Sequence, residues 1–146
     1  MKKAQMSKVY ILEDDPSRMV KFDRHMTFAD VYLHRDNAAQ FIEAIERDGG
    51  TDTPIDVMFL DHDLGGEQMV SSALKNTGME VVRWMVENKP DVRLVIVHTL
   101  NPSAGEEMIW RLKDAGYHTV RSPFYTLDFD GDLLDASLVY SGKVNE

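Results

Sequence analysis

The sequence contains no cysteine. This absence excludes a disulfide framework and any metal site that is built on thiolates. Long apolar runs are also missing, and none approaches the roughly 20 residues that a membrane-spanning helix needs. Residues 1–7 include two lysines, but no apolar stretch of the kind found in secretory signals follows them. We therefore expect a cytoplasmic protein with no membrane partner.

Basic side chains are scarce, since 16 Lys and Arg residues stand against 25 Asp and Glu residues and give a formal net charge of −9. Duplex DNA is an unsuitable partner for such a surface, because phosphate contacts need positive charge. A small phosphorylated ligand or an RNA end is compatible, because a divalent cation can bridge carboxylates and phosphate. The 146 residues suit a single domain, 1–146. Its motifs lie in about 8–124, and 125–146 is an uncertain carboxyl-terminal segment.

Short β-prone apolar runs alternate with helical apolar patterns along the chain. The runs predict strands at 9–12, 31–33, 55–60, 92–97 and 117–120. Four helices are predicted between these runs. The first extends from Pro16 to about Met26, and the second from a cap at Asp36 or Asn37 to the glycines at 49–50. The third begins with a capping box at 77–80 and ends before Pro90, and the fourth begins with a capping box at 103–106 and ends near Gly116. Residues 133–140 form either a short helix or a last strand. This alternation predicts an α/β fold with a five-stranded parallel sheet covered on both faces.

Polar side chains cluster where the predicted strands end. Glu13 and Asp14 follow the first strand, and three further groups follow later strands: Asp61, His62 and Asp63; His98, Thr99 and Asn101; Arg121 and Ser122. The carboxyl ends of parallel strands share one edge of the sheet, and ligands bind at that edge. We therefore expect one functional site there. The long polar loop 65–76 is either a lid over this site or a surface insertion.

The carboxylates of Glu13, Asp14 and Asp61 would repel one another without a cation between them. An all-oxygen ligand set suits Mg²⁺ best, with Mn²⁺ as an alternative. Asp63 is either a fourth oxygen ligand or a cap for the loop that follows. Arg121 is either a phosphate clamp or a surface charge.

Two histidines, His62 and His98, fall on the same acidic edge and titrate near neutral pH. They are candidates for general acid–base catalysis or for nitrogen ligation of Zn²⁺ or Mn²⁺. The remaining histidines, His25, His34 and His118, are interpreted as structural or solvated.

Several motifs resemble response-regulator receiver domains. Residues 11–18, Ile-Leu-Glu-Asp-Asp-Pro-Ser-Arg, resemble their first strand and turn, and Asp61 matches their phosphoacceptor aspartate. Thr77-Gly78 resembles the Asp-Gly that opens their third helix, and Ser122-Pro123-Phe124 resembles their Lys-Pro-Phe. The resemblance covers roughly 8–124. It implies a three-layer flavodoxin-like fold with strand order 2-1-3-4-5, in which Asp14 and Asp61 are direct metal ligands and Glu13 lies nearby.

Two departures point to a more specific resemblance. Ser122 replaces the receiver lysine that contacts the phosphoryl group, which argues against ordinary phosphorelay signalling. Residues 61–66, Asp-His-Asp-Leu-Gly-Gly, and 98–102, His-Thr-Leu-Asn-Pro, resemble the cyclic-phosphate-processing receiver-like family of prokaryotes and their phages. This resemblance implies action on cyclic phosphates, such as 2′,3′-cyclic nucleotide ends.

Three functions follow as hypotheses. The first is a metal-dependent phosphoesterase that opens a cyclic phosphate, in which Asp61, His98 and His62 are catalytic. His98 would protonate the leaving alkoxide, and His62 would act as base or as phosphate donor. The phosphate would be bound by Thr99, Asn101, Arg121 and Ser122. The second is a stand-alone receiver that is phosphorylated on Asp61 and acts on a protein partner, and the third is a nucleotide-binding module without catalytic activity.

Overall fold

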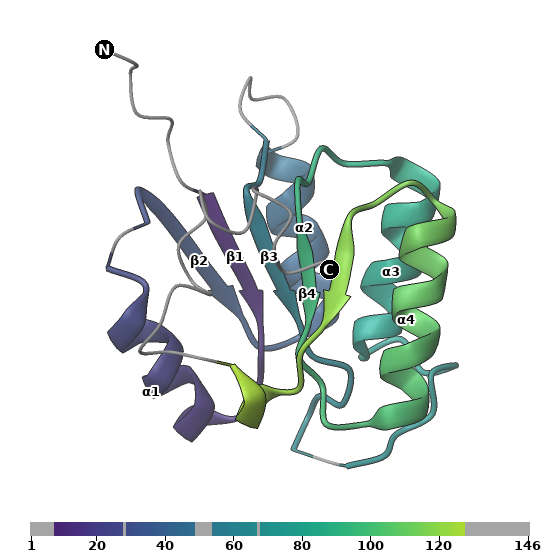
Figure 1. Ribbon diagram of the computed structural model, residues 1–146, viewed down its shortest axis with the longest axis horizontal. Coiled ribbons are helices and arrows are strands. Elements are labelled where there is room, and N and C mark those ends of the chain that lie inside the picture. Colours follow the sequence, from purple (N-terminus) through teal and green to yellow (C-terminus); the bar gives the residue numbers. More distant parts are fainter. Residues whose placement is uncertain (1–7, 28, 49–53, 67, 128–146) are drawn as a thin grey trace.

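The computed structural model describes residues 8–27, 29–48, 54–66 and 68–127. Five strands and four helices alternate along this part of the chain (Figure 1): β1 (Lys8–Leu12), α1 (Pro16–His25), β2 (Val31–Arg35), α2 (Ala38–Asp48), β3 (Val57–Leu60), α3 (Gly78–Asn88), β4 (Val95–Val97), α4 (Pro102–Asp114) and β5 (Thr119–Arg121), followed by the short 3₁₀ helix η1 (Phe124–Thr126). The strands form one sheet of order β2-β1-β3-β4-β5, and all four pairings are parallel. The predicted fold and strand order are therefore confirmed.

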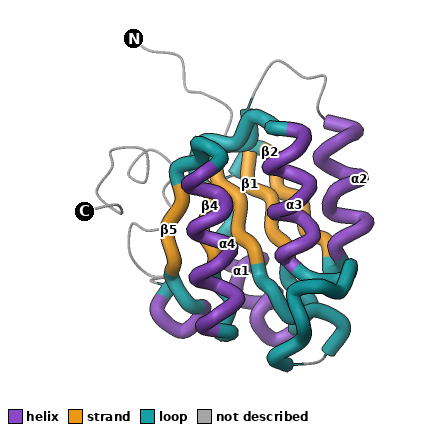
Figure 2. Tube along the Cα trace, turned by 90° about the vertical axis from the view of Figure 1, so that its right-hand side faces the viewer, coloured by secondary structure: helices purple, strands orange, loops and turns teal. Residues whose placement is uncertain are grey.

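The helices cover both faces of the sheet, as Figures 1 and 2 show. On one face, α1 and η1 pack against the odd-numbered side chains of β1 and β3, among them Val9, Ile11 and Phe59. On the other face, α2, α3 and α4 pack against the side chains that alternate with these, including Leu12 and Leu60. Burial on both faces explains why the central strands are continuous apolar runs without polar alternation.

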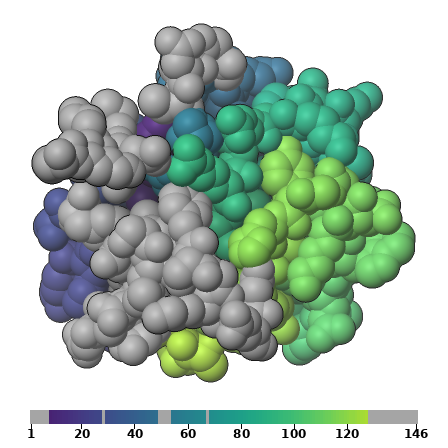
Figure 3. Space-filling model, turned by 45° about the horizontal axis from the view of Figure 1, so that its top comes forward, coloured from purple at the N-terminus to yellow at the C-terminus, as the bar shows by residue number. Residues whose placement is uncertain are grey.

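The α3-to-β5 part of the chain forms a continuous surface in the space-filling view, where it runs from teal to green (Figure 3). This continuity reflects the packing of α3 beside α4, which both lie on the near side of the sheet in Figure 2. Among the described helices, none has the length and apolarity that crossing a membrane would require.

The strands on one side of the sheet are shorter than the apolar runs that predicted them. β3 begins at Val57, and the preceding Ile55 makes only an isolated parallel bridge with Val92. Between them, Asp56 turns its carboxylate toward β1, where its Oδ2 accepts a hydrogen bond from the Lys8 backbone N–H at 2.8 Å. β5 is displaced toward the carboxyl terminus and ends at Arg121, after the predicted end at Val120.

The predicted capping box at 103–106 is wrong, because α4 begins at Pro102, two residues earlier than an N-cap at Ser103 would place it. Asn101 is its N-cap, with the side chain accepting from the Ala104 backbone N–H, and Pro102 fills the first turn, where its missing N–H has no consequence. Thr77 does hold the N-cap position of α3, but its hydroxyl donates to the Leu74 carbonyl and makes no cap hydrogen bond. The glycines at 49–50 and the segment 133–140 lie outside the described residues.

Candidate active site

A cavity of about 270 Å³ opens at the carboxyl ends of β1, β3 and β4. The switch point of the strand order lies here, because β2 neighbours β1 on one side and β3 neighbours it on the other. This is the edge at which parallel α/β sheets bind their ligands. The lining combines acidic, basic and apolar side chains: Asp14, Asp15, Pro16, Arg18, Asp61, Asp63, Gly66, Gln68, Met69, Thr99 and Leu100.

A buried cluster of Glu13, Asp61 and His98 forms the floor beside this cavity. One potential ligand atom from each residue lies within 4.8 Å of the others, and all three side chains are buried. The Nε2 of His98 donates to Glu13 Oε1 at 2.8 Å. The other ring nitrogen, Nδ1, has no hydrogen-bond partner among the described residues. The imidazole is surrounded by the edges of three phenylalanine rings, Phe22, Phe59 and Phe124. His98 therefore supports Glu13 from behind and does not line the cavity.

The surroundings move the pKa values of the three carboxyl groups in different directions. Burial alone would raise the pKa of Glu13, but the hydrogen bond and positive charge of His98 outweigh it and lower this pKa. Burial and the adjacent Glu13 charge raise the pKa of Asp61 to about 7. Burial also raises the pKa of Asp14. Asp61 is thus the carboxyl group that changes its protonation state near neutral pH.

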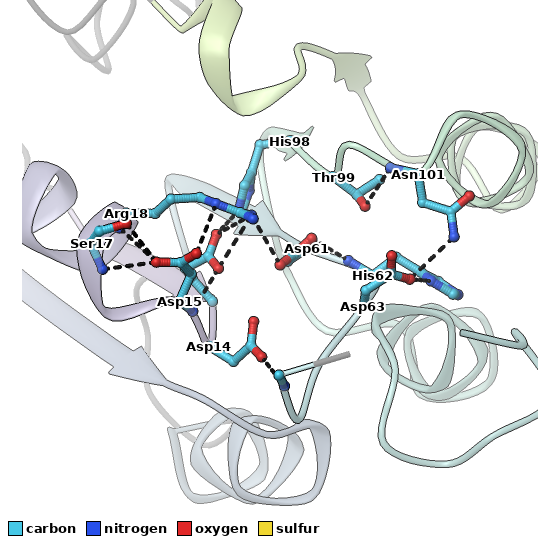
Figure 4. A network of polar contacts seen from close by, with 12 residues as sticks. Asp14, Asp15, Ser17, Arg18, Asp61, His62, Asp63, His98, Thr99 and Asn101 are labelled. Atoms are coloured by element: carbon cyan, nitrogen blue, oxygen red, sulfur yellow. Dashed lines mark hydrogen bonds and ion pairs between the residues drawn. The ribbon is translucent and has the colours of Figure 1, made fainter. Parts of the chain in front are cut away.

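Arg18 is the one cation among the described residues that line the cavity. Its Nη1 lies 3.4 Å from Glu13 Oε1 and 3.6 Å from Asp61 Oδ2, so that it spans the two strand ends (Figure 4). The guanidinium lies above the ring of Phe124, 5.7 Å from its centroid. No functional role was predicted for Arg18. A signal was present, because side chains in the first turn of a helix lean toward its amino terminus, and here that direction leads back to the acidic end of β1.

His62 is buried and holds the loop that follows β3. Its Nδ1 lies 2.7 Å from Asp63 Oδ1, and its Nε2 lies 2.9 Å from the Ser72 hydroxyl, so that both ring nitrogens have partners. Asp63 in turn accepts from the backbone N–H groups of Met69 and Val70. These hydrogen bonds, acting against burial, lower the pKa of Asp63. Asp63 lines the cavity, but its oxygens organise the loop, which is the second of its two predicted roles.

The turn at the start of this loop closes over Asp14. Gly65 and Gly66 both have φ of +80°, a conformation that glycine adopts without strain. The backbone N–H of Gly66 donates to Asp14 Oδ2 at 2.7 Å. At the far end of the loop, Asp63 and Thr77 form an isolated antiparallel bridge. The loop is therefore tied at its base and contributes one wall of the cavity.

The predicted phosphate-binding residues divide into two groups. Thr99 lines the cavity, and its Oγ1 accepts from the backbone N–H of Asn101, whose amide donates to Asp63 Oδ1 at 3.1 Å. The structure does not place Asn101, Arg121 or Ser122 in the cavity lining. Arg121 Nη2 donates to the Thr99 carbonyl, and its side chain lies against Gly105 of α4. The Ser122 hydroxyl lies 3.1 Å from that of Thr126.

The residues present fit a hard divalent cation. Four aspartates line the cavity, and two of them, Asp14 and Asp61, lie next to the buried Glu13, whose lowered pKa keeps it ionised. Oxygen ligands of this kind suit Mg²⁺ or Mn²⁺.

A family model for the cyclic-phosphate processing receiver domain matches residues 9–114. The chain belongs to this family. The match contains every element from β1 to α4 and all residues of the cavity lining. No curated protein matches the sequence.

Solved structures of receiver domains share the fold of this family member. The BeF3-activated receiver domain of DrrB, an OmpR/PhoB homolog from Thermotoga maritima, superposes with a TM-score of 0.61 at 17% identity, over 95% of this chain and 100% of that one. The signal receiver domain of a LuxO repressor protein from Vibrio parahaemolyticus gives 0.59 at 16% identity, over 97% and 94%. The non-phosphorylated receiver domain of RcsB from Escherichia coli gives 0.58 at 14%, over 94% and 92%. At these identities the likeness concerns the fold.

Proposed function

We propose that the protein is a metal-dependent phosphoesterase that opens a cyclic phosphate, such as that of a 2′,3′-cyclic nucleotide or RNA end. The observation that carries this proposal is the composition of the cavity. Four aspartates, Asp14, Asp15, Asp61 and Asp63, and the guanidinium of Arg18 line the same space. This combination serves a divalent cation and a phosphate together. The family to which the chain belongs supplies the substrate class.

Glu13, Asp14 and Asp61 would hold Mg²⁺ or Mn²⁺. When bound, such an ion polarises a phosphoryl group and lowers the pKa of water. Arg18 would direct the phosphate into the cavity, and the hydroxyl of the lining residue Thr99 would donate to a phosphate oxygen. The exposed apolar side chains of Met69 and Leu100 at the same cavity would contact the rest of the ligand.

Hydrolysis adds water to phosphorus and breaks one of the two ring P–O bonds, and the proton lost by the water finally resides on the released alkoxide oxygen. Asp61 faces the cavity and would hold the ion that lowers the pKa of the attacking water, so the proton would pass to the alkoxide oxygen through water in the cavity. His98 would act through Glu13, to which its Nε2 donates, as a positioning residue. His62 would position the loop, since both of its ring nitrogens are engaged there.

The test is turnover of 2′,3′-cyclic AMP and of an oligonucleotide with a 2′,3′-cyclic phosphate end, with Mg²⁺ or Mn²⁺ present. Products are separated by chromatography. We expect Asp61→Asn to reduce turnover by at least about a hundredfold, because it removes one of the carboxylates that would hold the ion. Glu43→Gln, which also removes one negative charge and lies on the exposed face of α2, is the control and should retain full activity. Absence of turnover by the unmodified protein with either metal would refute the proposal.

A second function is supported by the position of Asp61 at the carboxyl end of β3 in a receiver fold. There the carboxylate would accept a phosphoryl group and signal to a protein partner. Incubation with acetyl phosphate and Mg²⁺, followed by intact-mass measurement, distinguishes the two functions. A stable added phosphoryl group that is lost in Asp61→Asn supports the receiver function. Calorimetric binding of a cyclic nucleotide without any product would instead indicate a binding module.

A further inference from the structure

The most unusual feature of the cavity is that a guanidinium already occupies the space between the carboxylates that fit a metal. Arg18 Nη1 lies within 3.6 Å of oxygens from both Glu13 and Asp61, which come from different strands. The side chain enters from α1 and crosses toward Asp61 (Figure 4). It thereby supplies positive charge at the point where a divalent cation would supply it.

The contacts of Arg18 with these carboxylates are loose. Its distances to the two oxygens of Glu13 are 3.4 and 3.5 Å, whereas strong charge-assisted hydrogen bonds measure about 2.7–2.9 Å. Its Nε is buried without a hydrogen-bond partner among the described residues and lies 3.7 Å from Asp15 Oδ2. No bidentate pair is formed. The arginine therefore neutralises the cluster by proximity, without the geometry that would hold it there firmly.

The side chain also has an alternative destination. Arg18 retains 18% of its side-chain exposure, and this exposed part borders the cavity. A planar guanidinium matches phosphate oxygens in a bidentate way. A dication placed among Glu13 and Asp61 would repel Arg18, and a phosphate in the cavity would attract it. Both forces act in the same direction.

We propose that Arg18 is a built-in counter-cation that neutralises Glu13 and Asp61 in the metal-free protein and moves to the phosphate when a divalent cation takes its place. This inference rests on the proposed function, since it assumes that metal and phosphate bind in this cavity. The movement of Arg18 makes metal and phosphate bind cooperatively. Metal releases Arg18 from the carboxylates so that it can bind phosphate, and phosphate draws Arg18 away from the metal site. By linkage, phosphate must then tighten metal binding by the same factor by which metal tightens phosphate binding.

The test measures Mn²⁺ binding by calorimetry with and without inorganic phosphate. Removing a positive charge a few ångströms from a dication favours the dication even at the dielectric constant of water. We therefore expect Arg18→Gln to bind Mn²⁺ at least about tenfold more tightly without phosphate, and to lose the phosphate-induced gain shown by the unmodified protein. Arg18→Lys keeps the charge without the planar fork and should retain weak Mn²⁺ binding with reduced cooperativity. Arg47→Gln makes the same change of net charge on α2 and should match the unmodified protein.

Protein unfolding is monitored alongside, and a larger Mn²⁺-induced rise in melting temperature for Arg18→Gln provides an independent measure of the same effect. The inference is overturned if Arg18→Gln binds Mn²⁺ no more tightly than the unmodified protein, or if it keeps the full cooperativity with phosphate. Failure of the unmodified protein to bind Mn²⁺ at all would instead overturn the proposed function, and with it this inference.

Discussion

Gly78 provides a sharp test of how the fold positions the site. It is the first residue of α3, and its backbone N–H donates to the His62 carbonyl at 3.0 Å. A Cβ atom added to Gly78 would lie 1.8 Å from the Asp61 carbonyl oxygen and 2.9 Å from the Met108 Cε. The first separation is about 1.2 Å below the 3.0 Å under which Cβ contacts essentially do not occur. Either α3 or the end of β3 must therefore move.

The change Gly78→Ala tests this contact. Helix propensity alone favours alanine by about 1 kcal/mol in a helix interior. Overpacking against backbone commonly costs about 1–3 kcal/mol, and here the atom in the way cannot rotate aside. We therefore expect a net loss of about 2 kcal/mol in the free energy of unfolding, measured by urea denaturation. Because Asp61 moves with its own carbonyl, we also expect Mn²⁺ affinity to fall by about tenfold or more.

Gly105→Ala in α4 is the matched control. A Cβ atom at this position would meet the Arg121 Nε at 2.5 Å, but Arg121 is a flexible side chain that can shift. Its cost should stay within about 1 kcal/mol, with unchanged Mn²⁺ affinity. A Gly78→Ala protein that is as stable as the original to within about 0.5 kcal/mol, with full Mn²⁺ binding, would refute the claim that α3 packs directly on the Asp61 backbone.

Three further predictions concern the polar groups around the cavity. Because the pKa of Asp61 is raised, the folded state between about pH 4 and 7 binds a proton that the unfolded state has released. The free energy of unfolding of the metal-free protein should therefore fall across this range by on the order of 2–4 kcal/mol. Urea denaturation in EDTA should show a weaker dependence on pH for Asp61→Asn, and an unchanged dependence would contradict the prediction. Asn101→Ser keeps an N-cap for α4 but removes the amide that reaches Asp63, so it should cost about 1 kcal/mol, against about 2 kcal/mol for Asn101→Ala. A serine variant as stable as the unmodified protein would count against the Asp63 hydrogen bond, and equal stability of the two variants would count against the N-cap. His62→Ala should increase amide hydrogen exchange throughout loop 64–76 while leaving the exchange of β1 unchanged, and a loop that stays protected would show that His62 does not hold it.

The elements of the fold were predictable because local patterns and tertiary packing agree. A continuous apolar run such as Val57–Leu60 would present apolar side chains on both faces of a strand. Such a run therefore predicts a strand of a parallel sheet that is covered by helices on both faces. Element ends were predicted less well. At the start of α4, the side chains of Asn101 and Ser103 are both chemically suited to capping, and only the position of Pro102 in the first turn selects Asn101.

The site was predictable in its carboxylates and less so in its cations and histidines. Asp14 and Asp61 lie within two residues of the carboxyl ends of the buried strands β1 and β3, which places them at the edge where the cavity opens. Arg121 follows the same rule, yet its guanidinium donates to the Thr99 carbonyl. Its partner comes from the neighbouring strand end, and no sequence pattern specifies that contact.

The sequence pattern determined the order of the elements and the acidic edge, because each depends on periodicity and on the burial of short apolar runs. The strand order of the sheet followed from the resemblance to receiver domains. The tertiary structure decided which charged groups meet in the cavity. Arg18 reaches it from α1, while His62 is enclosed by its own loop and His98 by phenylalanine rings. Those outcomes depend on side-chain direction and on partners distant in sequence, since a buried polar group takes the nearest hydrogen-bonding group that folding brings to it.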